Sequence, residues 1–155
     1  MDVRSSLYNP AGAVEPTQVR IPLADRSVDR IFLFSVFTHM LRPDIEHYLS
    51  EFKRMLNSGG LVYATSFIYD DEILVSARRN SASTPWSLTF AYQHEPGCRL
   101  NDQNVPLHAV AFTLEAWREM VGRSGLMLRE FLPGKWSGYY QQYEDGQDAV
   151  VLAAC

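Results

Sequence analysis

The stretch "SVFTHMLRPDIEHYLSEFKRMLNSGGLVYATSF", residues 35–67, decides the fold of this chain. Pro43 stands where a helix can begin, because a proline in the first turn of a helix costs no hydrogen bond. Apolar side chains then recur every three or four residues, which is the pattern of an amphipathic helix. These apolar positions are Ile45, Tyr48, Leu49, Phe52, Met55 and Leu56. Gly59 and Gly60 follow, and we expect a glycine here to end the helix as a left-handed cap.

An apolar run flanks this helix on each side, at residues 31–37 and 61–67. The first run is continuous and does not alternate with polar residues, which is typical of a strand buried on both faces of a parallel sheet. A strand, a helix and a strand joined by short links form a βαβ unit with a right-handed crossover. The sequence therefore predicts an α/β fold.

The elements after this unit are less regular. Asp70 opens a short helix through Arg79, and the residues that follow indicate loops with one short strand at 88–93. Irregular regions of this length are usually functional or mobile. Because the region also contains aromatic side chains, we expect residues 70–111 to form a lid-like insertion that packs over the rest of the chain.

The C-terminal third returns to a clear pattern. Thr113 is a good N-cap for a helix that ends at Gly125, and strands are expected at residues 126–134 and 148–155. With 155 residues, the chain has the length of one domain, and we expect 1–155 to form a single domain.

Composition excludes several classes of function. Net charge is −4 and the basic residues are scattered, so there is no basic stripe for nucleic acid. No apolar run approaches the roughly 20 residues that span a bilayer, and no apolar signal segment follows Met1, so we expect a cytoplasmic protein without a membrane partner. Cys98 and Cys155 are expected to be free thiols, and no histidines or cysteines have the spacing of metal ligands.

Two stretches carry a resemblance to a known family. They are "IPLADRSVDRIFLFSVFTHM", residues 21–40, and "YLSEFKRMLNSGGLVYATSF", residues 48–67. Both resemble the class I S-adenosylmethionine-dependent methyltransferases of the small-molecule branch, with an aspartate before strand four and an R-x-L-x-x-G-G entry into strand five. That entry is similar to Arg54, Leu56, Gly59 and Gly60 here. The resemblance implies a partial Rossmann-like sheet, strands four to seven with flanking helices, in which the last strand runs antiparallel.

The resemblance also implies S-adenosyl-L-methionine as the cofactor. The family holds it with a glycine-rich loop after strand one, and no such loop occurs in this sequence, where Gly12 is the single glycine before Gly59. The similarity therefore covers the C-terminal half of the family's domain. Two functions stay open: a methyltransferase, or its C-terminal half, acting on a small-molecule nucleophile, and a non-catalytic, truncated methyltransferase-like domain that serves dimerisation or partner binding.

Four candidate site residues lie at the C-terminal end of the first predicted strand. Open α/β sheets bind ligands beyond the carboxyl ends of their strands, and Ser35, Phe37, Thr38 and His39 stand there. The resemblance implies that Ser35 and Phe37 line the cofactor side of the cleft and Thr38 the substrate side. His39 is a candidate catalytic base, because an imidazole titrates near neutral pH. In the alternative interpretation Phe37 belongs to the core, and Thr38 and His39 cap the turn before the helix.

Three more candidates lie outside this segment. The resemblance implies that Asp2 is the aspartate that follows strand three and faces the adenine; the alternative is an exposed terminal residue. Tyr69 and Trp86 are candidates for the wall of a substrate pocket, although aromatic residues in long loops also form small satellite cores.

The missing strands have a consequence for assembly. In the family's sheet the strand at Ile31–Phe37 lies beside strand one, which this sequence lacks, so we expect it to be an edge. The segment has no charge, proline or glycine, which makes it a poor edge for a monomer. We therefore expect a homodimer or a domain-swapped pair that buries the Ile31–Phe37 edge.

Overall fold

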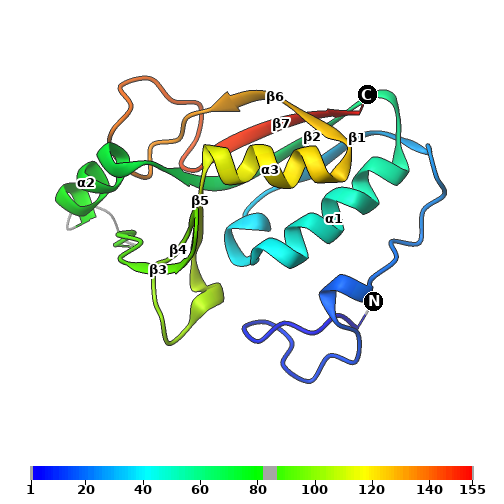
Figure 1. Cartoon of the computed structure of the whole chain (residues 1–155), viewed down its shortest axis with the longest axis horizontal. Coiled ribbons are helices and arrows are strands. Elements are labelled where there is room, and N and C mark those ends of the chain that lie inside the picture. Colours follow the sequence, from blue (N-terminus) through cyan, green and yellow to red (C-terminus); the bar gives the residue numbers. More distant parts are fainter. Residues whose placement is uncertain (1, 82–86, 155) are drawn as a thin grey trace.

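The computed structural model describes residues 2–81 and 87–154. Within them a sheet is covered by helices that pack mainly on one side (Figure 1). The elements in chain order are η1 (Pro16–Gln18), β1 (Val28–Leu33), η2 (Phe37–His39), α1 (Arg42–Met55), β2 (Leu56–Tyr69), α2 (Asp71–Asn80), β3 (Tyr92–Glu95), β4 (Cys98–Leu100), η4 (Pro106–His108), β5 (Val110–Thr113), α3 (Leu114–Ser124), β6 (Leu126–Leu132) and β7 (Asp148–Ala154). The α/β class predicted from the sequence is confirmed.

The predicted βαβ unit is present as β1, α1 and β2, with β1 and β2 parallel. Strand β1 is shorter than expected, because it ends at Leu33 rather than Phe37. Ser35 adopts a left-handed conformation with φ of 55°, which breaks the extended backbone. The apolar residues beyond it form the single turn η2 instead of a strand.

The two glycines do not cap the helix, so that part of the prediction was wrong. Helix α1 ends at Met55, and β2 begins at the next residue. Gly59 has a φ of 73°, but it lies inside β2. Opposite it the pairing with β1 is irregular, since Val28 pairs with Leu56 and Arg30 with Leu61. The left-handed glycine therefore serves a β-bulge, where an extra loop of backbone must be accommodated.

Strand β2 organises the sheet. Its first part lies between β1, which is parallel to it, and β7, which is antiparallel. Its last three residues, Phe67–Tyr69, pair with β5, and β4 and β3 continue from there. On the other side β6 pairs antiparallel with β7, as expected for the end of this fold.

The insertion contains more regular structure than the sequence indicated. Residues 92–100 were expected to be mostly loop, yet they form β3 and β4, and β5 was not predicted at all. Gly97 has a φ of 74° and supplies the tight turn between β3 and β4. The predicted helix after Asp70 is confirmed as α2, whose first turn is capped by the Asp70 side chain at 2.8 Å from the backbone N of Ile73.

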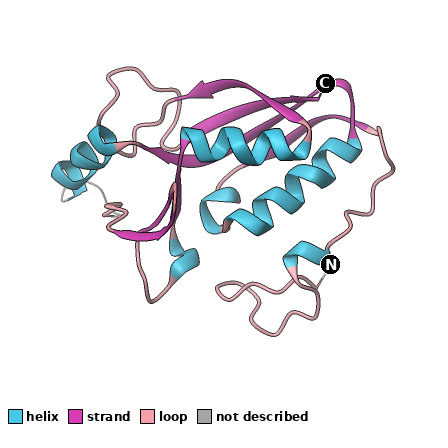
Figure 2. Ribbon diagram, in the orientation of Figure 1, coloured by secondary structure: helices cyan, strands magenta, loops and turns pink. Residues whose placement is uncertain are grey.

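Two hydrophobic clusters lie on opposite faces of β2. The larger one contains Val62 and Ala64 and packs under α1 and α3 (Figure 2). The smaller one contains Phe67 and Tyr69 and packs against α2 and the loop before β7. Side chains alternate between the two faces of a strand, so the long β2 joins both clusters. In the described part of the chain no helix is long and apolar enough to cross a membrane.

Candidate active site

Ser35 marks the carboxyl end of β1. Its backbone N–H donates to the Thr65 hydroxyl at 2.8 Å, and its own hydroxyl donates to the Gln147 side chain at 3.1 Å. A non-glycine residue in the left-handed region carries a conformational cost, and such residues often lie at functional sites. The bonds to β2 and to the loop before β7 hold Ser35 in this conformation.

His39 lies at the end of η2, which packs against β2, β5 and η4. Its Nδ1 is 2.9 Å from the carbonyl oxygen of Leu107. A carbonyl can only accept, so Nδ1 carries the proton, and in the neutral ring Nε2 holds an available lone pair. The ring of Tyr8 packs edge-on against the imidazole, with 5.7 Å between ring centroids. This arrangement fixes both the tautomer and the ring orientation that a general base needs.

Phe37 and Thr38 are both fully buried. The Phe37 ring lies in the larger cluster, 5.7 Å from the Trp117 ring and 6.1 Å from that of Phe52. It therefore offers no exposed surface to a ligand in this structure. The Thr38 hydroxyl has no hydrogen-bond partner among the described residues, which is unusual for a buried polar group.

Tyr69 ends β2 and belongs to the smaller cluster. Burial raises the pKa of its hydroxyl, and Gln93 forms a hydrogen bond with it. Because Phe37 belongs to the larger cluster, these two candidates lie on opposite faces of the sheet and do not meet. Trp86 lies outside the described residues.

Asp2 lies in an N-terminal loop that is closed by hydrogen bonds between its own residues. Its carboxylate accepts from the Asn9 side chain at 2.9 Å and from the backbone N of Ala13 at 3.2 Å. The bond from Asn9, followed by that from Ala13, lowers the pKa of this exposed carboxyl. Both bonds close the loop on itself, and this segment packs beside α1, away from β1 (Figure 1).

Asp148 is a buried carboxylate that the sequence did not single out. It accepts hydrogen bonds from the backbone N atoms of Ile68 and Gly134 at 2.7 Å and from Trp136 Nε1 at 2.6 Å. Burial raises the pKa of Asp148 to about 6, although all three bonds act to lower it. The carboxylate ties the loop before β7 to β2 and so supports the smaller cluster. No local sequence signal identifies it, since Ile68 is distant in the chain.

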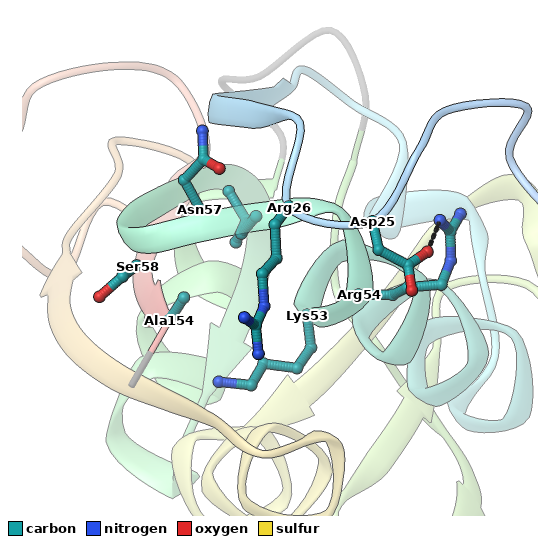
Figure 3. Close-up of a pocket in the computed structure, with 8 residues that line it drawn as sticks. Asp25, Arg26, Lys53, Arg54, Asn57, Ser58 and Ala154 are labelled. Atoms are coloured by element: carbon teal, nitrogen blue, oxygen red, sulfur yellow. Dashed lines mark hydrogen bonds and ion pairs between the residues drawn. The ribbon is translucent and has the colours of Figure 1, made fainter.

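A pocket of about 530 Å³ lies at the opposite ends of the strands (Figure 3). Arg26 and Lys53 line it, and beside them Arg54 pairs with Asp25 at 2.8 Å. Ligands of open α/β sheets bind at the carboxyl ends of the strands, whereas this pocket adjoins the amino ends of β1 and β2. We therefore assign its ion pairs to structure. A second pocket, of about 440 Å³, lies between α2 and Tyr139, whose hydroxyl donates to Glu72 at 2.6 Å.

The described residues do not make a complete site for S-adenosylmethionine. A nucleoside cofactor of this kind needs backbone N–H groups at a glycine-rich turn and a carboxylate for the ribose, as dinucleotides do. The sequence has no glycine-rich turn after a strand, and the Asp2 carboxylate is engaged by its own loop. Nor do the described residues contain a group of three or more histidine, cysteine or acidic side chains able to hold a metal ion.

Comparisons with known proteins agree with the fold. Residues 6–64 match a family model described as a methyltransferase domain. A methyltransferase from Methanosarcina mazei, described as SAM-dependent, is similar with a TM-score of 0.55 at 14% identity, over 92% of this chain and 68% of that one. The 1,6-didemethyltoxoflavin-N1-methyltransferase of Burkholderia thailandensis, solved with that compound and S-adenosylhomocysteine, gives 0.54 at 10% identity, over 92% and 49%.

An O-methyltransferase family 2 protein from Planctomyces limnophilus, in complex with apigenin, has a TM-score of 0.55 at 13% identity. The match covers 91% of this chain and 34% of that protein, so this chain spans only part of the length of the enzymes it resembles. Such identities show the fold, and the family model adds a match in sequence over residues 6–64. The methyltransferase-like fold that the sequence resemblance predicted is therefore confirmed.

Proposed function

We propose that this chain carries the acceptor side of an S-adenosylmethionine-dependent methyltransferase that acts on a small-molecule nucleophile. The observation that carries the proposal is His39, which is held at the carboxyl end of β1 with its proton on Nδ1. Its Nε2 is then able to take the proton that an O–H or N–H nucleophile must release. The cofactor supplies an electrophilic methyl group when it is bound. Beyond the proton transfer to His39, most of the acceleration of methyl transfer then comes from holding the methyl donor and the acceptor in line.

The substrate side of the proposal rests on the insertion. Helix α2 starts directly beyond the carboxyl end of β2, and β5 pairs with the last residues of that strand. We propose that residues 70–111 act as a lid over the acceptor, with Thr38, Tyr69 and Trp86 on the substrate side and Ser35 on the cofactor side. The buried, unpartnered hydroxyl of Thr38 supports a role for this turn in binding a polar group. The proposal includes the cytoplasmic location expected from the sequence, which fractionation of host cells would test.

His39→Ala tests the catalytic assignment in an active preparation. We expect turnover to fall by about 10²-fold or more, because general bases contribute on that order, while the melting temperature changes by no more than a few degrees. His47→Ala is the matched control, since His47 also bonds a backbone carbonyl, that of Val19, but lies on α1. Equal turnover in wild type and His39→Ala would remove His39 from the mechanism.

The second candidate function is a non-catalytic domain that serves dimerisation or partner binding. The absence of a glycine-rich turn in the sequence favours it for this chain by itself. Calorimetry with S-adenosylhomocysteine separates the two functions. A dissociation constant below roughly 100 µM, about 5.5 kcal/mol, would show that the isolated chain binds the cofactor product and would favour the methyltransferase over the non-catalytic domain.

We also propose that in the isolated chain a second copy covers the free edge of β1, which is the part of the predicted Ile31–Phe37 edge that forms a strand, as a homodimer or a domain-swapped pair. The support is that β1 pairs with β2 and with no other strand in the described residues. Unpaired strand edges readily pair with another chain. Sedimentation at micromolar concentration is the test, and a stable monomer would contradict the pairing.

A further inference from the structure

His39 lies between two segments that are far apart in the sequence. Its Nδ1 bonds the carbonyl oxygen of Leu107 in η4, and the ring of Tyr8, from the N-terminal loop, packs against its imidazole. Figure 1 shows this loop, in dark blue, reaching the part of the molecule where η4 lies. The imidazole is half-buried. Because η4 holds the Nδ1 edge of the ring, a ligand reaches His39 from the side that Tyr8 borders.

Tyr8 offers most of its ring to such a ligand. The residue is 68% exposed although it contacts His39. The two rings stand at 85° to each other, with 5.7 Å between their centroids, and so form a corner that we call the Tyr8–His39 corner. Aromatic molecules stack with an offset or meet edge to face. A flat molecule that stacks on the face of Tyr8 therefore directs its edge toward the imidazole.

The backbone that carries Tyr8 is held in place. Ser5 and Asn9 exchange two backbone hydrogen bonds, at 2.9 and 3.0 Å, which close a turn around Tyr8. The backbone N of Tyr8 donates to the Ser5 hydroxyl at 3.2 Å, and the Asn9 side chain donates to the Asp2 carboxylate at 2.9 Å. A surface that is already ordered loses little freedom when a ligand binds to it. The loop therefore presents Tyr8 as a preformed wall beside His39.

We propose that Tyr8 is a specificity-determining residue of the acceptor site, and that it selects flat aromatic acceptors with an O–H or N–H group on the ring. This inference rests on the proposed function and names its acceptor class. The acceptor stacks on Tyr8, and the group on its edge passes its proton to Nε2 of His39 and keeps the electron pair. The chemistry fits a ring hydroxyl, since a phenolic O–H titrates at about pH 10, within reach of an imidazole base.

Binding of 2-naphthol, a flat molecule with a hydroxyl on its ring, tests the inference on the full chain without the cofactor. The matched compound is decahydro-2-naphthol, which has the same carbon skeleton and hydroxyl but no aromatic ring. The imidazole NMR signals of His39, identified by their loss in His39→Ala, report binding at the Tyr8–His39 corner rather than at another apolar surface. We expect 2-naphthol to shift these signals and to bind at least about threefold more tightly than decahydro-2-naphthol.

Substitutions at Tyr8 assign the preference to its ring. Tyr8→Ala should weaken 2-naphthol binding by about three- to tenfold, the order expected for the loss of one aromatic pair, and should remove the difference between the two compounds. Tyr8→Leu, which fills the space without a flat face, should remove it as well, whereas Tyr8→Phe should keep it. Tyr143→Ala removes another exposed tyrosine, whose ring lies against Lys135, and should bind 2-naphthol as wild type does.

Three results would each overturn the inference. They are His39 signals that do not move up to the solubility limit of 2-naphthol, equal affinities of wild type for the two compounds, and an unchanged preference in Tyr8→Ala and Tyr8→Leu. The turnover of His39→Ala judges the proposed function separately. A preference that depends on Tyr8, together with unchanged turnover in His39→Ala, would refute the catalytic base and leave the aromatic site standing. Lost turnover without such a preference would overturn this inference alone.

Discussion

Replacing Glu51 by glutamine should remove the ion pair that holds the segment before β1 on helix α1. The Glu51 carboxylate receives two bonds from Arg54, at 2.8 and 2.9 Å, and one from the backbone N of Ile21 at 2.8 Å. Arg54 also donates to the carbonyls of Ile21 and Leu23 and to the Asp25 carboxylate. The Glu51 and Arg54 side chains are only 12% and 14% exposed. The network therefore fixes the chain that leads into β1.

The magnitude follows from the pKa. Hydrogen bonds from Arg54 lower the pKa of Glu51 from 4.5 to about 2. One pKa unit corresponds to about 1.4 kcal/mol, so the pair stabilises the fold by at most ~3 kcal/mol. Asp25, at the outer side of the network, is 65% exposed, and solvent screening reduces the expected value to about 2 kcal/mol. For a chain of this length the loss lowers the melting temperature by about 4–8 °C.

The lowered pKa of Glu51 also predicts the direction in which its contribution to stability changes with pH. The pKa is lower in the folded state, so the stabilisation is fully present above pH 4.5 and is lost as the pH falls through about 2. The difference in the free energy of unfolding between wild type and Glu51→Gln should therefore fall, and roughly two fifths of its value at pH 7 should remain at pH 3. Urea denaturation followed by circular dichroism at pH 7, 5 and 3 measures it. The control is Glu46→Gln, which breaks the more exposed pair with Arg123 and should cost about 0.5 kcal/mol. Two results would refute the reasoning. One is an equal loss of unfolding free energy in the two variants at pH 7, and the other is a loss in Glu51→Gln that stays constant down to pH 3.

Two further predictions concern a buried charge and a bulge. Because burial raises the pKa of Asp148 to about 6, its contribution to stability is greatest below pH 4 and is lost as the pH rises through 6. Urea titrations of wild type and Asp148→Asn give the difference between their free energies of unfolding. This difference, wild type minus variant, should be larger at pH 4.5 than at pH 7, and a difference independent of pH would contradict the prediction. Gly59→Ala should cost about 1 kcal/mol through its positive φ alone, since an added Cβ meets no atom within 4 Å. Gly122→Ala, at an equally open position inside α3, should stabilise the fold by about 0.5–1 kcal/mol. If thermal melts show that both substitutions change the stability in the same direction, the backbone conformation of Gly59 does not explain the effect.

Local signals in the sequence determined the helices and the order of the βαβ unit. Thr113 caps α3 through a bond to the backbone N of Ala116 at 3.1 Å, and Gly125 ends it with a φ of 75°. Asp70 caps α2 in the same way. Such signals can be recognised in the sequence alone, because each depends on residues only three or four positions away. They also point to residues 35–39 as candidates for a site, because the end of the first strand follows from the βαβ order.

The candidate roles within that site needed the tertiary structure. A sequence shows that Phe37 and His39 follow a strand, but it does not show which of them points into the core. The bond that fixes the His39 tautomer comes from Leu107, and the bond that holds Ser35 comes from Thr65. These partners lie 68 and 30 positions away, so periodicity and capping carry no information about them.

Tertiary pairing also decided where strands begin and end. Residues 31–37 are apolar throughout, yet the strand stops at Leu33, because Ser35 turns toward β2 and the loop before β7. The short strands β3 to β5 exist because the last residues of β2 offer β5 an edge on which to pair. Strand pairing gains free energy from a partner that is distant in sequence, so a short segment with weak local preference becomes a strand only when the fold brings that partner to it.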